Sequence, residues 1–133
     1  MKVQVRYYSR SGNTKLLAEA IAKGVGTKAI SIDDKDSAIK DKTDILFIGG
    51  ALYAYGLDNK LKKYIANLDS KKINQVVVFS TSWISKHSID LLKKYCREKG
   101  ISVKEEYIYY KNKPKESELK EAEELAKKLL KER

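Results

Sequence analysis

Short apolar segments alternate along the chain with longer segments in which apolar residues recur every three or four positions. The segments DILFIGG (44–50) and QVVVFS (75–80) are almost continuously apolar, as expected for strands buried on both faces of a sheet. Gly24 and Gly100 stand where helices are expected to stop. The pattern predicts strands near residues 2–8, 27–32, 44–49, 74–80 and 101–110, and helices near residues 13–25, 58–68, 86–99 and 116–131.

The alternation of strands and helices is typical of an α/β fold with a parallel sheet that helices cover on both faces. Five such strands fit the doubly wound order 2-1-3-4-5, whose ligand site lies at the carboxyl ends of strands 1 and 3. The link 33–43 holds only two apolar residues, Ala38 and Ile39. We therefore expect a reduced or missing helix between strands 2 and 3, and thin cover over the side of strand 1 that carries Gln4 and Arg6.

Composition predicts a water-soluble protein that forms one domain over residues 1–133. The 28 Lys and Arg against 18 Asp and Glu give a formal net charge of +10. Basic charge of this size is found in nucleic-acid-binding proteins. Here, however, lysines and acids are mixed along the chain, which is typical of solvated helix faces. We expect no nucleic-acid partner, and we expect the positive charge to favour acidic partners.

The sequence shows no sign of membrane insertion, secretion or metal binding. No apolar run is as long as a membrane span, and the N-terminus lacks the pattern of a signal peptide. The single Cys96 cannot form an internal disulfide, which fits a reducing compartment, so we expect a cytoplasmic location. One His and one Cys cannot build a structural zinc site.

A hydroxyl-rich turn, SRSGNT, joins the first strand to the first helix. The amino end of a helix presents unpaired N–H groups and a positive dipole end, and small residues let a phosphate approach the backbone. Helix capping explains one such residue but not five in a row. The turn also lacks the Walker and dinucleotide glycine patterns. The candidate phosphate-binding residues are Ser9, Arg10, Ser11, Gly12, Asn13 and Thr14.

The segment YYSRSGNT (7–14) closely resembles the phosphate loop of the flavodoxin family, usually Ser/Thr-x-Ser/Thr-Gly-Asn-Thr. DILFIGGALYAYG (44–56) is similar to the second flavodoxin loop, and VVVFSTSW (76–83) stands where the third loop belongs. The resemblance extends over the whole chain and implies a flavodoxin-like fold, FMN binding and electron transfer. FMN is favoured over FAD because no second glycine-rich motif is available for an adenylate.

The resemblance also assigns contacts to the flavin ring, which needs apolar walls and backbone hydrogen bonds at its edges. Flavodoxins usually carry an aromatic residue at the position of Tyr53, so we expect Tyr53 to stack on the ring, with Leu52 as a candidate for the other wall. Tyr55 and Trp83 remain alternatives as stacking residues. The candidate ring contacts are Ala51, Leu52, Tyr53, Ala54, Tyr55, Gly56, Thr81, Ser82 and Trp83.

Flavodoxins tune the flavin by flipping one peptide of the second loop. The flipping residue is Ala54 if Tyr53 stacks, and Gly56 if Tyr55 stacks; glycine makes the flip easier. The sequence leaves both registers open.

The leading interpretation is an FMN-binding electron-transfer protein that serves redox partner proteins. One alternative is a flavodoxin-like FMN-dependent oxidoreductase acting on a quinone or porphyrinogen, although no residue is an obvious substrate acid or base. The other alternative is a flavodoxin-like module without flavin. Typical flavodoxins are strongly acidic, whereas this chain is basic, so we expect its partners to have acidic docking faces.

Overall fold

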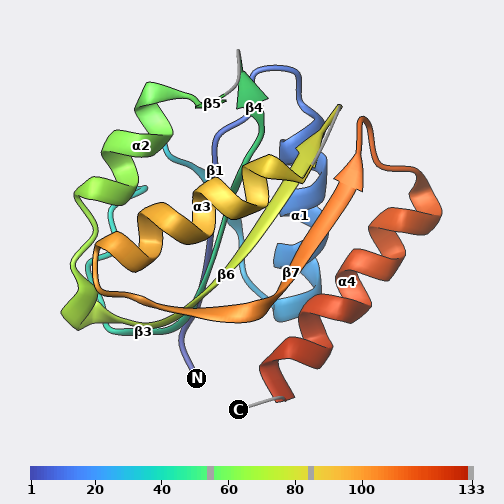
Figure 1. The fold of residues 1–133 in the computed structure, drawn as a ribbon. Coiled ribbons are helices and arrows are strands. Elements are labelled where there is room, and N and C mark those ends of the chain that lie inside the picture. The colour runs from blue at the N-terminus through green and yellow to red at the C-terminus, as the bar shows by residue number, and fades with distance from the viewer. Residues whose placement is uncertain (54–55, 84–85, 132–133) are drawn as a thin grey trace.

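A computed structural model describes residues 1–53, 56–83 and 86–131 (Figure 1). One sheet contains β1 (Val3–Tyr7), β2 (Ala29–Ser31), β3 (Thr43–Gly50), β6 (Ile73–Ser82) and β7 (Ser102–Lys111). Its strands are parallel and lie in the order β2-β1-β3-β6-β7. Counted along the main sheet this is the predicted order 2-1-3-4-5. A short antiparallel pair, β4 (Leu52–Tyr53) and β5 (Gly56–Leu57), follows β3.

Helices cover both faces of the sheet, as predicted (Figure 1). Alternate residues of β3 explain this: Phe47 packs in one core with Leu17 and Ala126, while Ile48 packs in the other with Leu61. The first core lies under α1 and α4, and the second lies under α2 and α3. The helices are α1 (Asn13–Val25), α2 (Asn59–Ala66), α3 (His87–Glu98) and α4 (Glu116–Lys131), with a short 3-10 helix, η1 (Ser70–Lys72), before β6.

Two strands, β2 and β6, differ from the sequence prediction by more than one residue at an end. β2 is limited to Ala29–Ser31 instead of 27–32. β6 continues past residue 80 because Thr81 and Ser82 still pair with Tyr110 and Lys111 of β7. Thr81 and Ser82 are therefore buried strand residues and not residues of an open loop.

Gly24 does not end α1, as its type suggested. The helix continues to Val25 and stops at Gly26, which adopts φ 75° and bonds to the last turn. At Gly24 a Cβ atom would collide with the backbone of Glu123 in α4. Gly24 thus permits the close approach of α1 and α4. Gly100, with φ 77°, directly follows α3 and its C-cap and has the predicted role.

No helix lies in the link between β2 and β3, whose residues are all described, which confirms the prediction. The expectation of thin cover was wrong for Arg6, which is 2% exposed. Its Nε donates to the Ser37 carbonyl at 2.8 Å and its guanidinium also donates to the Val5 carbonyl at 3.1 Å. The Tyr64 hydroxyl of α2 donates to the same Ser37 carbonyl. The link therefore covers β1 without a helix, through these hydrogen bonds and through Ile39, which packs against the apolar core.

The contact at Gly24 is testable by Gly24→Ala. Overpacking against the Glu123 backbone should destabilise the protein by about 1–3 kcal/mol, reduced by the higher helix propensity of alanine. Urea denaturation measures this change, with the exposed Lys23→Ala on the same helix as the control. Equal or greater stability of Gly24→Ala would show that the two helices can move apart freely.

Candidate functional site

Three connections meet at one edge of the sheet because β1, β3 and β6 are parallel neighbours. Tyr7 pairs with Gly49, and Gly50 pairs with Ser80, so the carboxyl ends of these strands are adjacent. The phosphate loop (residues 9–14) follows β1 and leads into α1. The second loop follows β3 and the third follows β6. The structure therefore brings together the three segments that the sequence predicted as one site.

The phosphate loop turns sharply at Gly12, which adopts φ 93° with open space around its missing Cβ. The Ser9 hydroxyl accepts from Gly12 N–H at 3.0 Å, and the Ser11 hydroxyl accepts from Asn13 N–H at 3.4 Å. In these two bonds each hydroxyl acts as the acceptor, so its O–H group can still donate a hydrogen bond to a ligand. The two serines therefore shape the loop and can also bind a ligand.

Among the described residues, neither the N-cap residue of α1 nor an acidic group in its first turn compensates the positive amino end of this helix. Its first turn holds no acidic residue, and its N-cap residue, Gly12, has no side chain that could cap the helix. Among the described residues no acceptor bonds the backbone N–H of Thr14 or Lys15. Free N–H donors, nearby hydroxyls and a helix dipole form a donor set suited to a phosphate monoester. The residues present thus fit the phosphate of a bound cofactor.

Thr14 has a different environment from the rest of the loop. It is 1% exposed, and its hydroxyl lies 2.7 Å from the hydroxyl of Thr81, which is 3% exposed. Either oxygen can be the donor. This buried pair ties the phosphate loop to the end of β6.

Serines link the ends of β3 and β6 to α3. The Ser80 hydroxyl donates to the Gly50 carbonyl at 2.5 Å and lies 2.6 Å from the Ser88 hydroxyl in the first turn of α3. The Ser82 hydroxyl lies 2.9 Å from the same Ser88 oxygen. All three serines are buried. The backbone of the second loop is thus fixed to the strand that carries the third.

Tyr53, in β4, contacts the phosphate loop. Its hydroxyl accepts from Arg10 N–H at 3.0 Å, and the Arg10 guanidinium lies 4.0 Å from the centre of its ring. The ring of Tyr8 meets it edge-on, with centroids 6.4 Å apart. Arg10 thus covers one face of the Tyr53 ring. Burial raises the pKa of the Tyr53 hydroxyl above its ordinary value of 10.0, so the group is protonated at neutral pH.

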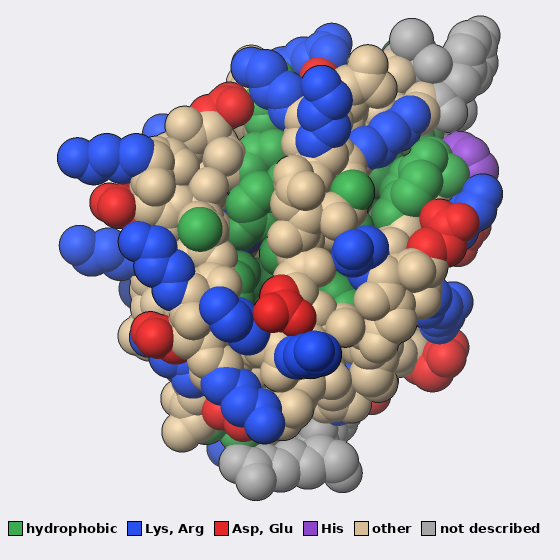
Figure 2. Space-filling model, turned by 90° about the vertical axis from the view of Figure 1, so that its left-hand side faces the viewer, with side chains coloured by type: hydrophobic (Ala, Val, Ile, Leu, Met, Phe, Trp, Pro, Cys, Tyr) green, Lys and Arg blue, Asp and Glu red, His purple; other side chains and the backbone are tan. Residues whose placement is uncertain are grey.

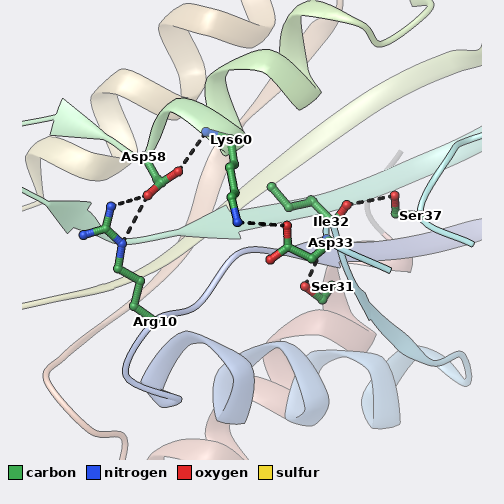
Figure 3. Close-up of polar contacts among 7 residues, drawn as sticks. All are labelled: Arg10, Ser31, Ile32, Asp33, Ser37, Asp58 and Lys60. Atoms are coloured by element: carbon green, nitrogen blue, oxygen red, sulfur yellow. Dashed lines mark hydrogen bonds and ion pairs between the residues drawn. The ribbon is translucent and has the colours of Figure 1, made fainter. Parts of the chain in front are cut away.

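A chain of polar contacts continues from Arg10 to α2 (Figure 3). The Arg10 guanidinium forms an ion pair with Asp58, through Nε at 3.1 Å and through a second nitrogen. Asp58 also caps α2 by accepting from Lys60 N–H at 2.8 Å. The Lys60 ammonium lies 3.6 Å from Asp33, just after β2. Desolvation acts to raise the pKa of Asp58, but the hydrogen bonds from Arg10 and Lys60 outweigh it and lower that pKa.

The remaining predicted residues vary in exposure. Trp83 is 70% exposed, while Ala51, Leu52 and Gly56 are half-buried. Leu52 pairs with Leu57 in the short β4–β5 ladder. Ala54 and Tyr55 lie outside the described residues, so the alternative registers of the second loop stay predictions.

Several residues of this edge were missed by the sequence prediction. Asp58 stands where a helix was expected to begin, so its capping role was readable, but its ion pair with Arg10 joins positions 48 residues apart. Ser80 and Ser88 form buried contacts that no sequence pattern marks. Tyr8 lies within the phosphate-loop motif but was not predicted to contact the site, because its contact with Tyr53 depends on the fold.

Other chemistry is not evident in the part of the chain that the structure describes. No group of three His, Cys, Asp or Glu side chains there could hold a metal ion. Burial raises the pKa of the Cys96 thiol to about 12, which makes it a poor nucleophile. None of the described helices is long and apolar enough to cross a membrane.

Comparison with known proteins gives one family. A family model described as a flavodoxin domain matches residues 4–110. No curated protein sequence matches the chain significantly.

Solved structures share the fold over nearly the whole chain. The Flv1 flavodiiron core from Synechocystis sp. PCC6803 is 26% identical with a TM-score of 0.80, and the match covers 98% of this chain and 35% of that one. The chain thus spans little more than a third of that protein. A flavodoxin from the domain Archaea is 23% identical with a TM-score of 0.82, covering 98% and 97% of the two chains. Oxidised Flavodoxin 1 from Bacillus cereus is 18% identical with a TM-score of 0.80, covering 100% and 99%.

The Thr14–Thr81 pair predicts a specific pattern of stabilities. Thr14→Val removes one hydroxyl with little change of shape and leaves the Thr81 hydroxyl buried without its partner, so it should cost about 1–3 kcal/mol. Thr14→Ser keeps the hydroxyl and is the control. The double variant Thr14→Val with Thr81→Val should be less destabilised than the sum of the single variants, as measured by chemical denaturation. Additive effects would mean that the two hydroxyls do not interact.

Proposed function

This chain belongs to the flavodoxin domain family, and on that premise we propose that it binds FMN and transfers electrons between redox partner proteins. The observation that carries the proposal is the amino end of α1, whose N–H donors at Thr14 and Lys15 have no acceptor among the described residues. This end faces no acid in its first turn and follows the open Gly12. A phosphate supplies the charge that these donors favour.

Different segments of the site would bind the two ends of the cofactor. We assign the phosphate to the loop 9–14, where the serine hydroxyls and backbone N–H groups would hold it. We assign the ring to the second and third loops, with the aromatic ring of Tyr53 as one wall and Leu52 and Trp83 as candidates for further contact. Bound FMN supplies the redox chemistry, because a flavin exchanges electrons one or two at a time. The chain contributes binding, orientation and shielding from water.

The hydrogen bonds between loops support binding without large rearrangement. Thr14 contacts Thr81, Arg10 contacts Tyr53, and Ser80 contacts the carbonyl of Gly50. These bonds join the phosphate loop to β6, the phosphate loop to the second loop, and the end of β3 to the end of β6. A site ordered before binding loses less entropy when the cofactor arrives. No observation favours the alternative of a substrate-specific oxidoreductase, and the alternative of a flavin-free module makes the opposite prediction for FMN binding.

We infer that the redox partners present acidic docking faces. Figure 2 shows more of the surface covered by Lys and Arg than by Asp and Glu on the side that includes α2. That helix, NKLKKYIA, carries Lys60, Lys62 and Lys63 and no acid, and it begins beside the Arg10–Asp58 pair. A positive field next to the cofactor steers negative surfaces toward it. We also propose a cytoplasmic location, supported by the single buried Cys96.

FMN binding is tested by titrating flavin-free protein with FMN, riboflavin and FAD while flavin fluorescence is measured. FMN should bind most tightly. Riboflavin, which lacks the phosphate, should bind at least about tenfold more weakly, because hydrogen bonds to a charged group are worth about 1.5–3 kcal/mol each. FAD should also bind more weakly, since its phosphates are linked to an adenylate. Equal affinity for FMN and riboflavin would contradict a phosphate site, and no binding of any flavin would favour the flavin-free module.

The charge proposal is tested with small redox reagents of opposite sign. The reduced FMN-loaded protein should be oxidised by the anion hexacyanoferrate(III) at a rate that falls as ionic strength rises, because salt screens the attraction. With the cation hexaammineruthenium(III) the rate should rise with ionic strength. Stopped-flow absorbance measures both rates. The reverse pattern would show a negative field at the site despite the net charge of +10.

A further inference from the structure

Arg10 is held at both ends by other segments. Its backbone N–H donates to the Tyr53 hydroxyl at 3.0 Å. Its guanidinium lies over the Tyr53 ring at 4.0 Å and pairs with Asp58. The phosphate loop is therefore attached through one residue to the second loop and to the start of α2. Figure 3 shows the contact with Asp58 at the start of α2.

Asp58 keeps the Arg10 guanidinium in this place. The Asp58 side chain is only 8% exposed, whereas that of Arg10 is 53% exposed. Movement of the guanidinium onto a phosphate would leave a buried carboxylate without its charged partner, and such a loss is costly. Of its side-chain hydrogen bonds with described residues, Asp58 would then keep the one from Lys60 N–H. The contacts favour an Arg10 that stays with Asp58 while the loop binds its ligand.

We propose that the Tyr53 hydroxyl and the Asp58 carboxylate position the phosphate loop through Arg10, and so couple the phosphate end of the FMN site to its ring end. The inference rests on the proposed function, because it assigns roles toward FMN. Tyr53 then has two tasks. Its ring offers a stacking face, and its hydroxyl fixes the backbone next to Ser11 and Gly12, where the phosphate is bound.

Tyr53→Phe separates these tasks because it keeps the ring and removes only the hydroxyl, with no change of charge. Any effect on stacking applies equally to FMN and riboflavin and cancels in the ratio of their dissociation constants. We expect the preference for FMN over riboflavin to fall about three- to tenfold, the worth of one hydrogen bond. Tyr110→Phe, which removes a hydroxyl bonded to Glu121 at 2.6 Å, is the matched control and should leave the ratio unchanged.

A second measurement needs no flavin. Amide hydrogen exchange at Arg10 should be faster in Tyr53→Phe, since its acceptor is lost, and also in Asp58→Asn, since the guanidinium is released. Asparagine is still a good N-cap, so α2 should keep its start. The amide of Phe79 in β6 should exchange at an unchanged rate, which separates local loosening from a loss of global stability.

The outcomes are distinguishable from those of the proposed function. If FMN binds and Tyr53→Phe weakens both flavins by the same factor, the positioning role is overturned while FMN binding stands. If no flavin binds, the proposed function fails, and faster Arg10 exchange in both variants still supports a loop held by Tyr53 and Asp58. Unchanged Arg10 exchange in either variant overturns the role of the group that it lacks.

Discussion

The parallel pairing of β1, β3 and β6 is the constraint on which the site depends. It brings Tyr7, Gly50 and Ser82 to one edge, although they are far apart in the sequence. Packing is tight at that edge, because a Cβ atom at Gly49 would collide with Phe79 of β6, and one at Gly50 would collide with the Leu61 side chain of α2. The glycines at the end of β3 are therefore required by core packing, and this packing determines the position of the loop that follows.

Charge is distributed over the site unevenly. The Arg10 charge is compensated by a buried carboxylate, and Lys60 reaches Asp33. The backbone donors at the start of α1 have no such partner among the described residues. The attraction for an anion thus comes from the helix end itself more than from the nearest cationic side chain. The net charge of the whole chain determines how charged partners are steered over long distances. It does not indicate which groups in the site are paired and which are free to attract an anion.

The sequence predicted the fold well because continuous apolar strands and amphipathic helices are read from local periodicity. It also predicted a phosphate loop at residues 9–14, since small hydroxyl residues between a strand and a helix are a local signal. It failed where packing decides: Gly24 was taken as a helix end, but α4 requires it inside α1. It likewise assigned Thr81 to a loop, because no local sequence pattern predicts that Thr81 pairs with Tyr110 of β7.

Contacts between distant segments could not be predicted for the same reason. Nothing in the local pattern at Arg10 or Asp58 indicates that the two residues meet. Local patterns indicated which segments meet at the candidate site, whereas the hydrogen bonds that join these segments follow only from the assembled sheet.

The polar link between β2 and β3 has a consequence for local unfolding. Segments with few apolar contacts detach at a lower free energy than the core. In most α/β domains the detachment of a covering helix would uncover apolar strand residues, which favours aggregation. Here the Ser37 carbonyl of the link accepts a hydrogen bond from the Arg6 guanidinium, and Ile39 of the link packs against the apolar core. Release of the link would expose a guanidinium that water solvates readily together with a small apolar surface, so this edge of the sheet can open with less exposed apolar area than the loss of a whole covering helix would create.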